Sequence, residues 1–448
     1  MNGRARLAPT VDAAATFVVA AAILGAAAGS SVQFDVWQVG RPVRWILLAV
    51  LLLFGLVRAA VARATWTISA LTAFALASFC GIALVSTAWS VNGHGTLVRA
   101  LGVTATISAA AAIAGSTRSS PTLAARVLDG VLAAALVVAI AGFVYWLISP
   151  SHAVVAATTE YPSRYQGIEQ NPNTAPLLFA FGAAVAFSRA LRARDAWLRA
   201  FFVLALLVLA ASIVASASRG GLLGAFAGVL VVAAQGPRAL RHRVALSALT
   251  VAALVVGAWV MTLPNALPAG PAPATRSATK TADAEDVLPL SQEIGNPWWT
   301  HRAGGSERSL FNTSIRARAL GGTFDRIEQR PIAGYGFGTE QWAFVNRYYA
   351  YDSQNPENGY VGILLQIGAV GLAVFLAMLA VCVGAGVRAL SATRDGVAVA
   401  TLGATAAGLT LGLSQSFFHG PGSIAYVAFW MSLLLTATIP LRGRALAA

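Results

Sequence analysis

The chain has 448 residues, of which 57% are hydrophobic and only 11% are charged. A soluble domain carries roughly 25% charged residues, so this chain cannot cover a water-facing surface of its size, and most of it is expected to lie in lipid. The formal net charge of +14 does not indicate nucleic-acid binding, because the basic residues occur in small groups between apolar runs and not as one patch.

Twelve apolar segments follow one another, most of them close to the roughly 20 residues that a membrane-spanning helix needs. They cover residues 12–31, 43–61, 67–89, 97–115, 125–148, 174–190, 197–217, 220–236, 244–264, 359–387, 397–417 and 421–440. The sequence therefore predicts an all-α, polytopic membrane protein with about twelve transmembrane helices. The first segment is expected to be retained as a helix, since no clear signal-peptide cleavage site follows it. Cys80 and Cys382 lie inside apolar runs, where no disulfide framework is expected.

Arginine positions predict the orientation of the chain. With a cytoplasmic N-terminus and twelve crossings, the cytoplasmic stretches hold 17 of the 31 basic residues, which agrees with the positive-inside rule. These are Arg4, Arg6, Arg58, Arg63, Arg118, Arg126, Arg189, Arg192, Arg194, Arg199, Arg238, Arg241, Arg243, Arg388, Arg394, Arg442 and Arg444. Both termini are therefore predicted to be cytoplasmic. Lys280 is the only lysine among the basic residues and alanine is very abundant, a composition typical of a GC-rich bacterial genome, so the membrane is expected to be a bacterial plasma membrane.

Four parts of the chain follow from this pattern. Residues 1–148 are expected to form helices one to five, residues 149–264 helices six to nine, and residues 359–448 helices ten to twelve. Residues 265–358 are expected to form a large extracytoplasmic loop domain between helices nine and ten, with ten of the 17 acidic residues and a helix from about 310 to 329.

Two arginines at the predicted outer face stand out. Arg164 precedes helix six in S-R-Y-Q-G-I-E-Q-N-P-N-T-A, where it is followed by Asn171 and Asn173. These groups offer a guanidinium and two amides at the bilayer surface, although Asn173 or Thr174 could simply cap the helix. Arg219 in S-A-S-R-G-G-L-L-G lies between two apolar runs with almost no loop. An arginine at this depth needs an anionic partner or water, unless its side chain reaches the interface.

The loop before helix ten carries a third motif. Arg316 and Arg318 begin a predicted helix, which is followed by Pro331 and by a glycine-rich turn with Gly334 and Gly336. A phosphate-binding P-loop is not favoured, because no Lys-Ser/Thr pair follows the glycines.

The fourth motif is N-P-E-N-G-Y, where Glu357 and Asn358 precede helix ten. A carboxylate at a helix N-terminus is favoured by the helix dipole, and it could also act as a general base at the membrane surface. His419, in F-F-H-G-P-G between the last two helices, is a competing candidate for the base on the same face. Its alternative interpretation is a loop residue without a role.

Together these loops offer several arginines and one carboxylate on one side of the membrane. Arginine suits bidentate binding of phosphate oxygens, so the pattern favours a lipid-linked diphosphate as ligand. Neither a metal nor a cofactor is expected, because the sequence has no His/Cys cluster with metal-ligand spacing. A transporter or flippase is the main alternative, but transporters place their sites near the bilayer midplane, whereas the polar features here gather at the outer face.

At these residues the sequence resembles the O-antigen ligase and O-antigen polymerase superfamily of bacterial membrane glycosyltransferases. The order of motifs matches: R-x-x-G and N-P-N before a helix, S-R-G-G opening a helix, a loop arginine before P-x-x-G-x-G-x-G, and E-N-G-Y followed by a G-x-x-G helix. The resemblance is strongest over about 160–385, and it implies a GT-C-like fold and a metal-independent inverting transfer.

The resemblance also implies partners and residue roles. The donor would be a glycan on undecaprenyl diphosphate, used in polysaccharide or lipopolysaccharide biosynthesis at the cell envelope, and the acceptor would be a lipid A core sugar, another glycan or a protein. Arg164, Arg219 and Arg316 match family arginines that hold the diphosphate. Glu357 stands where the ligases carry a histidine that activates the acceptor hydroxyl; in this respect the chain departs from the lipopolysaccharide ligases.

Overall fold

The apolar segments form a bundle of long helices. The computed structural model describes residues 3–31, 34–61, 68–117, 120, 122–155, 164–168, 170–235, 314–343, 356–393, 395–420 and 422–438. Eleven of the twelve predicted segments coincide with helices there, and the twelfth, 244–264, lies outside the described residues. The helices are α1 (Gly3–Gly29), α2 (Phe34–Val61), α3 (Ala70–Val85), α4 (Gly93–Gly115), α5 (Leu123–Ile148), α7 (Ala175–Arg192), α8 (Ala196–Ala215), α9 (Arg219–Ala234), α13 (Gly359–Thr393), α14 (Gly396–Leu411) and α15 (Tyr426–Ala437).

Within the described residues, eight helices are long and apolar enough to cross a membrane, and α9, α14 and α15 are shorter apolar helices. The chain is thus a multi-pass membrane protein, as predicted, while the total of twelve spans stays a prediction. Large apolar side chains such as Phe17, Leu147 and Trp197 are more than three-quarters exposed, which suits lipid as the surrounding medium.

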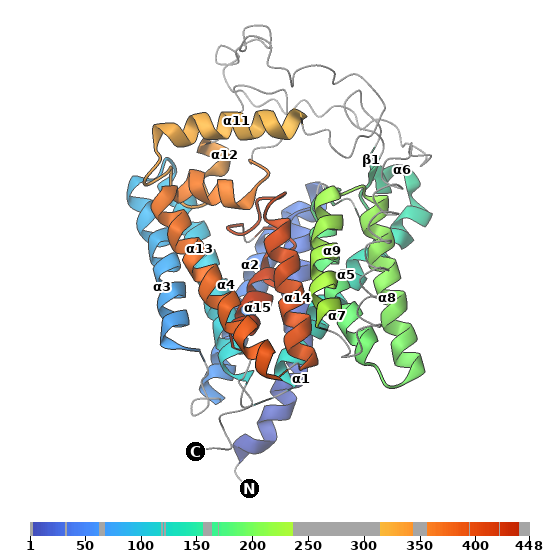
Figure 1. The fold of residues 1–448 in the computed structure, drawn as a ribbon. Coiled ribbons are helices and arrows are strands. Elements are labelled where there is room, and N and C mark those ends of the chain that lie inside the picture. Colours follow the sequence, from blue (N-terminus) through green and yellow to red (C-terminus); the bar gives the residue numbers. More distant parts are fainter. Residues whose placement is uncertain are drawn as a thin grey trace.

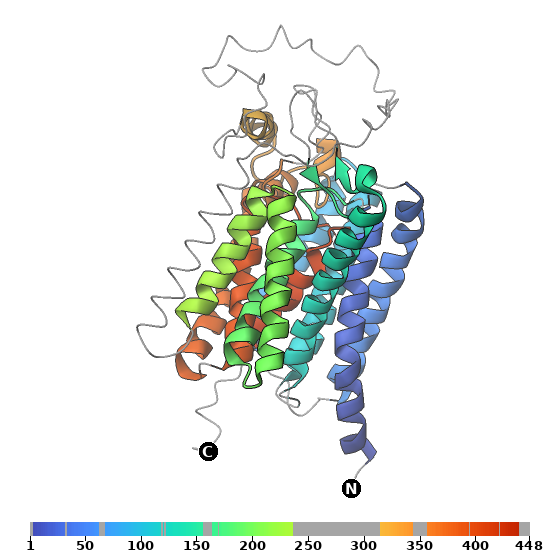
Figure 2. The ribbon, with the colours of Figure 1, turned by 90° about the vertical axis from the view of Figure 1, so that its right-hand side faces the viewer.

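The connecting elements gather at one end of the bundle, which we call the loop end (Figures 1 and 2). They are η2 (Ser86–Trp89), α6 (Pro150–Ala153), α11 (Ser314–Gln329), α12 (Glu340–Ala343) and an antiparallel pair of two-residue strands, β1 (Val154–Val155) and β2 (Arg164–Tyr165). The helix α11 confirms the helix expected at about 310–329. At the opposite end of the bundle, α1 begins and α15 ends (Figure 1).

Small residues allow the helices of the bundle to approach closely. In α9 and α14, a Cβ atom on Gly228 would lie 2.9 Å from the Gly403 carbonyl oxygen, and one on Gly403 would lie equally close to the Gly228 oxygen. Van der Waals contact between such small residues is a main source of helix association in lipid. This contact fixes α9, which begins with Arg219, against α14, which leads into the loop before α15.

A few charged side chains lie between the helices, in pairs. Arg58 of α2 is fully buried, and its Nη1 atom lies 3.1 Å from the Asp12 carboxylate of α1, which also accepts a hydrogen bond from Ser120. Arg189 of α7 donates to Asp129 of α5 at 2.6 Å. Both arginines are among those predicted to be cytoplasmic, and both lie in the last turn or so of their helices, at the end opposite the loop end.

Candidate active site

Arg164 joins two segments at the loop end. It lies in β2, opposite Val155 of β1, and is half-buried. Its Nε atom donates to the Ser216 carbonyl oxygen at 2.9 Å, and its Nη2 atom donates to Asn173 Oδ1 at 2.7 Å. The guanidinium therefore connects the segment before α7 with the turn between α8 and α9.

Of the two capping candidates, Thr174 is the N-cap residue of α7, although it makes no side-chain capping bond. The Asn173 side chain accepts the hydrogen bond from Arg164 instead. Asn171 instead shapes the turn, since its Oδ1 atom accepts the Asn173 backbone N–H at 2.8 Å.

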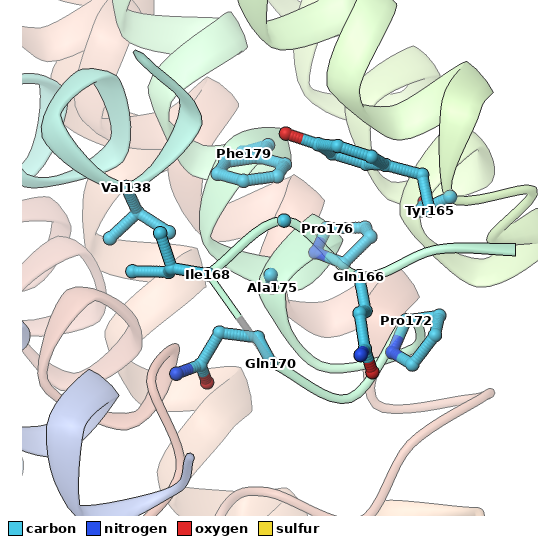
Figure 3. A pocket seen from close by; sticks show the side chains of 11 residues that line it. Val138, Tyr165, Gln166, Ile168, Gln170, Pro172, Ala175, Pro176 and Phe179 are labelled. Atoms are coloured by element: carbon cyan, nitrogen blue, oxygen red, sulfur yellow. The ribbon is translucent and has the colours of Figure 1, made fainter. Parts of the chain in front are cut away.

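A small pocket lies beside the Arg164 bridge (Figure 3). It opens between α5 and α7, under the segment that follows β2. Its lining residues are Val138, Tyr165, Gln166, Gly167, Ile168, Gln170, Pro172, Ala175, Pro176, Phe179 and Ser216. The ring of Tyr165 stacks on Phe143 with centroids 5.6 Å apart, and burial raises the pKa of its phenol well above the usual value. The phenol is therefore neutral, and the pocket is mostly apolar.

The start of α9 is held by a tight turn. Ser218 caps the helix by accepting the Gly221 N–H at 3.2 Å, and Ala217 before it has a positive φ of 52°, a conformation that costs a non-glycine residue about 1–3 kcal/mol. A Cβ atom on Gly220 would lie 3.0 Å from the Ser414 Cβ atom. The glycine next to Arg219 thus lets α9 meet the loop between α14 and α15.

That loop, residues 412–425, is called the α14–α15 loop below. The start of α13 is hydrogen-bonded to this loop as well. The Gly359 N–H donates to the Gly412 oxygen at 2.7 Å, and Asn358 Nδ2 donates to the Leu413 oxygen at 3.1 Å. Asn358 Oδ1 in turn accepts the N–H groups of the next helical turn at 3.0 and 3.1 Å. Glu357 precedes this cap with a positive φ of 50°.

The glycine-rich turn, residues 331–339, packs against a break in α13. At Ile367 and Gly368 the backbone of α13 is not helical, and the ribbon changes direction near α12 (Figure 1). The turn satisfies the backbone groups that the break releases: Gly336 N–H donates to the Gln366 oxygen at 2.7 Å, and Ala369 N–H donates to the Pro331 oxygen at 2.8 Å. The turn therefore stabilises the break in α13.

A buried polar cluster lies beneath the glycine-rich turn. The Glu340 side chain is 1% exposed, and its Oε1 atom accepts hydrogen bonds from Ser416 Oγ at 2.6 Å and from Gln366 Nε2 at 2.8 Å. Its Oε2 atom lies 3.4 Å from His419 Nε2, and the other ring nitrogen of His419 lies 3.1 Å from Gln366 Nε2. The guanidinium of Arg99 interacts electrostatically with Glu340 and stacks on Trp342 at 4.7 Å.

Burial governs the charges of this cluster. It raises the pKa of Glu340 to about 7, although hydrogen bonds from Ser416 and Gln366 and the charge of Arg99 act in the opposite direction. It lowers the pKa of His419 to about 3, and Arg99 adds to that effect. His419, which the sequence offered as a competing base, is therefore a buried neutral imidazole.

The structure brings three of the four sequence motifs together. The Arg164 bridge reaches Ser216, Arg219 follows three residues later, and the α14–α15 loop joins the start of α9 to the Glu357–Asn358 cap. Arg316 and Arg318 lie in the first two turns of α11 at the same end, but their side chains are outside the described residues. Gly334 and Gly336, each with a positive φ, lie in the glycine-rich turn that packs against the break in α13.

Four residues of the cluster escaped the sequence analysis: Arg99, Glu340, Gln366 and Ser416. Glu340 directly follows the glycine-rich turn, and this position was the one available clue. Arg99 and Gln366 lie inside apolar helices, where the sequence gives no indication that they converge. Among the described residues, no group of three or more His, Cys, Asp and Glu side chains is arranged to hold a metal ion.

A protein-family model described as O-antigen ligase matches residues 204–376. This stretch runs from α8 into α13 and contains Arg219, the glycine-rich turn, Glu340 and Glu357. A comparison with curated proteins finds no match. The residues from 204 to 376 are therefore an O-antigen ligase family domain, carried by a multi-pass membrane protein.

Proposed function

We propose that this protein transfers a glycan from undecaprenyl diphosphate to an acceptor hydroxyl at the outer face of the bacterial plasma membrane. The observation that carries the proposal is the convergence of Arg164, Arg219 and the Glu357–Asn358 cap at the loop end, within or next to the O-antigen ligase domain. The donor is already activated, so the transfer needs no nucleotide.

The chemistry of a diphosphate leaving group supports roles for the arginines. Negative charge develops on the diphosphate as the bond to the sugar breaks, and fixed guanidiniums in a poorly hydrated site stabilise that charge. Arg164, which bonds to Ser216, and Arg219, three residues after Ser216, are proposed to serve this task, and Arg316 and Arg318 are proposed to approach from α11. Asn173, which bonds to Arg164, and Asn171, which bonds to the Asn173 backbone, are proposed to orient Arg164.

The distribution of arginines supports the proposed orientation. Seven arginines lie in or next to the helix ends opposite the loop end, which agrees with a cytoplasmic location for that end. They are Arg58, Arg126, Arg189, Arg192, Arg194, Arg199 and Arg388. Reporter fusions after Gly236 and Arg394 should read cytoplasmic, and a fusion near Gly304 should read extracytoplasmic. A cytoplasmic reading near Gly304 would place the site in the wrong compartment.

Deletion of the gene tests the activity itself. Loss of long surface glycans together with accumulation of lipid-linked donor supports transfer. A transporter or flippase predicts a different result, because the lipid-linked glycan would then accumulate at the inner face and stay inaccessible to externally added glycosidases. Complementation with Arg219→Lys tests the role of the arginine in addition. This variant should not restore glycan transfer, since lysine keeps the charge but loses the bidentate fork.

A further inference from the structure

The buried carboxyl of Glu340 is hydrogen-bonded to a side chain that lies nearer the surface. Its Oε1 atom accepts a 2.6 Å hydrogen bond from Ser416 Oγ, and Ser416 is half-buried whereas Glu340 is almost fully enclosed. Gly362 of α13 makes room for this pair, because a Cβ atom there would lie 2.6 Å from Ser416 Oγ and would overlap Glu340 Oε1. The hydroxyl thus links an enclosed carboxyl to the outer side of the cluster.

Ser416 lies within the segment that unites the proposed site. Two residues before it, Ser414 faces Gly220 at the start of α9, and Leu413 accepts the Asn358 side chain that caps α13. Ser416 therefore lies on the same short loop that contacts the start of α9, next to Arg219, and the start of α13.

We propose that Ser416 and Glu340 form a proton relay, in which Glu340 is the final proton acceptor of the transfer. This inference rests on the proposed function. The acceptor oxygen forms a bond to the anomeric carbon, and the bond from that carbon to the diphosphate breaks with its electron pair on the diphosphate. The acceptor proton moves to Ser416 Oγ while the proton of Ser416 moves to Glu340 Oε1, so that Glu340 becomes neutral.

The surroundings of Glu340 suit a proton acceptor. Gln366 from α13 donates to the same oxygen and is uncharged, His419 from the α14–α15 loop is neutral, and Arg99 from α4 supplies a positive charge that acts on it. A general base is most effective when its pKa lies near the working pH, and burial brings the pKa of Glu340 to about 7. Transfer should therefore rise with pH between about 6 and 8, as the carboxyl loses its proton.

Spheroplasts of the deletion strain provide the test, because the medium sets the pH at the outer face. Full-length wild type and the variants Glu340→Gln, Ser416→Ala and Ser416→Thr are compared at equal protein levels, and polymer formation from the cell's own lipid-linked glycan is followed from pH 5.5 to 8.5. Ser212→Ala is the control, since this buried serine of α8 bonds to the Val208 carbonyl oxygen of its own helix.

The relay predicts a set of rates that a structural role does not. Glu340→Gln keeps the shape of the side chain and should lower the rate by about 10²–10⁴-fold and remove its rise with pH. Ser416→Ala should do the same, Ser416→Thr should restore the rate because it keeps the hydroxyl, and Ser212→Ala should match wild type. Wild-type pH dependence in Glu340→Gln, or full activity of Ser416→Ala, would overturn the relay.

Binding of undecaprenyl diphosphate to the purified proteins in nanodiscs separates this inference from the proposed function. Wild type and Glu340→Gln should both be stabilised against heat by this lipid, because the relay does not contact the diphosphate. If wild type neither binds it nor restores surface glycans, the proposed function fails and the relay fails with it. If Glu340→Gln does not fold, the comparison of Ser416→Ala with Ser416→Thr tests the relay.

Discussion

Replacing Gly368 by alanine should separate the glycine-rich turn from α13. Gly368 has φ 65° and ψ −172°, a region of backbone conformation that is essentially restricted to glycine and costs other residues about 1–3 kcal/mol. A Cβ atom there would lie 2.6 Å from the Ala333 nitrogen and would overlap the Ile332 carbonyl group. Both neighbours are backbone, so the turn itself must move.

Movement of the turn breaks the hydrogen bonds that join it to the helix. Three of them are the Tyr335 N–H to the Leu365 oxygen, the Gly336 N–H to the Gln366 oxygen, and the Ala369 N–H to the Pro331 oxygen. Each such bond contributes about 0.5–1.5 kcal/mol net. With the backbone term, Gly368→Ala should cost about 3–7 kcal/mol.

The assay is the midpoint of thermal aggregation of the detergent-solubilised protein, measured by size-exclusion chromatography after heating. Gly81→Ala is the matched control: Gly81 also lies in an apolar helix, α3, but a Cβ atom there meets no atom within 4 Å. The control should be as stable as wild type or slightly more so. Equal midpoints for Gly368→Ala and Gly81→Ala would show that the turn does not hold the break in α13.

Three further predictions concern charged residues. Arg164→Lys should lower glycan transfer by at least about tenfold, because one ammonium cannot bond both Ser216 and Asn173 as the guanidinium does; normal surface glycans in that variant would refute the role. Arg58→Met should cost about 3–5 kcal/mol in thermal denaturation since it leaves Asp12 buried without its partner, and adding Asp12→Leu should recover part of this loss. Asp129→Asn should leave surface glycans unchanged and cost at most about 1 kcal/mol, because the Asp129–Arg189 pair is partly exposed; defective glycans would link that end of the bundle to transfer.

The helices could be predicted from the sequence because lipid imposes a simple rule. Every backbone polar group in the hydrocarbon must be satisfied within the segment, so a long apolar run implies a helix. The runs at 125–148 and 197–217 became α5 (Leu123–Ile148) and α8 (Ala196–Ala215), within two residues at either end.

The break in α13 could not be predicted by that rule. The run from 359 to 387 has no proline, and Gly368 alone does not require a kink, since glycine also occurs in regular membrane helices. The break persists because a distant segment, the glycine-rich turn, supplies hydrogen bonds to the groups that it releases. The sequence showed the glycines of the turn, but not the helix to which they would bind.

The site residues divide in the same way. Arg164, Arg219 and Glu357 were predicted because a charge at the end of an apolar run is conspicuous, and local spacing places it at the interface. Glu340 was missed because its role depends on partners from three other segments: Arg99, Gln366 and the α14–α15 loop. Nothing local distinguishes it from the other acidic residues of the loop domain, since a buried cluster arises only from long-range packing.

Adjacent aromatic residues explain how one short loop can hold these segments in place. Phe417 and Phe418 are at most 1% exposed, and their rings pack on Phe429 of α15 at 5.6 and 4.8 Å, while Phe418 also packs on Phe375 of α13 at 5.2 Å. These contacts anchor the loop in the core of the bundle. Its backbone oxygens at 412 and 413 then accept hydrogen bonds from the start of α13, and Ser416 and His419, on either side of the two phenylalanines in the sequence, contact Glu340. The proposed transfer needs groups from different helices held at defined distances before the substrate arrives, and an anchor buried among α13 and α15 provides that rigidity at the loop end.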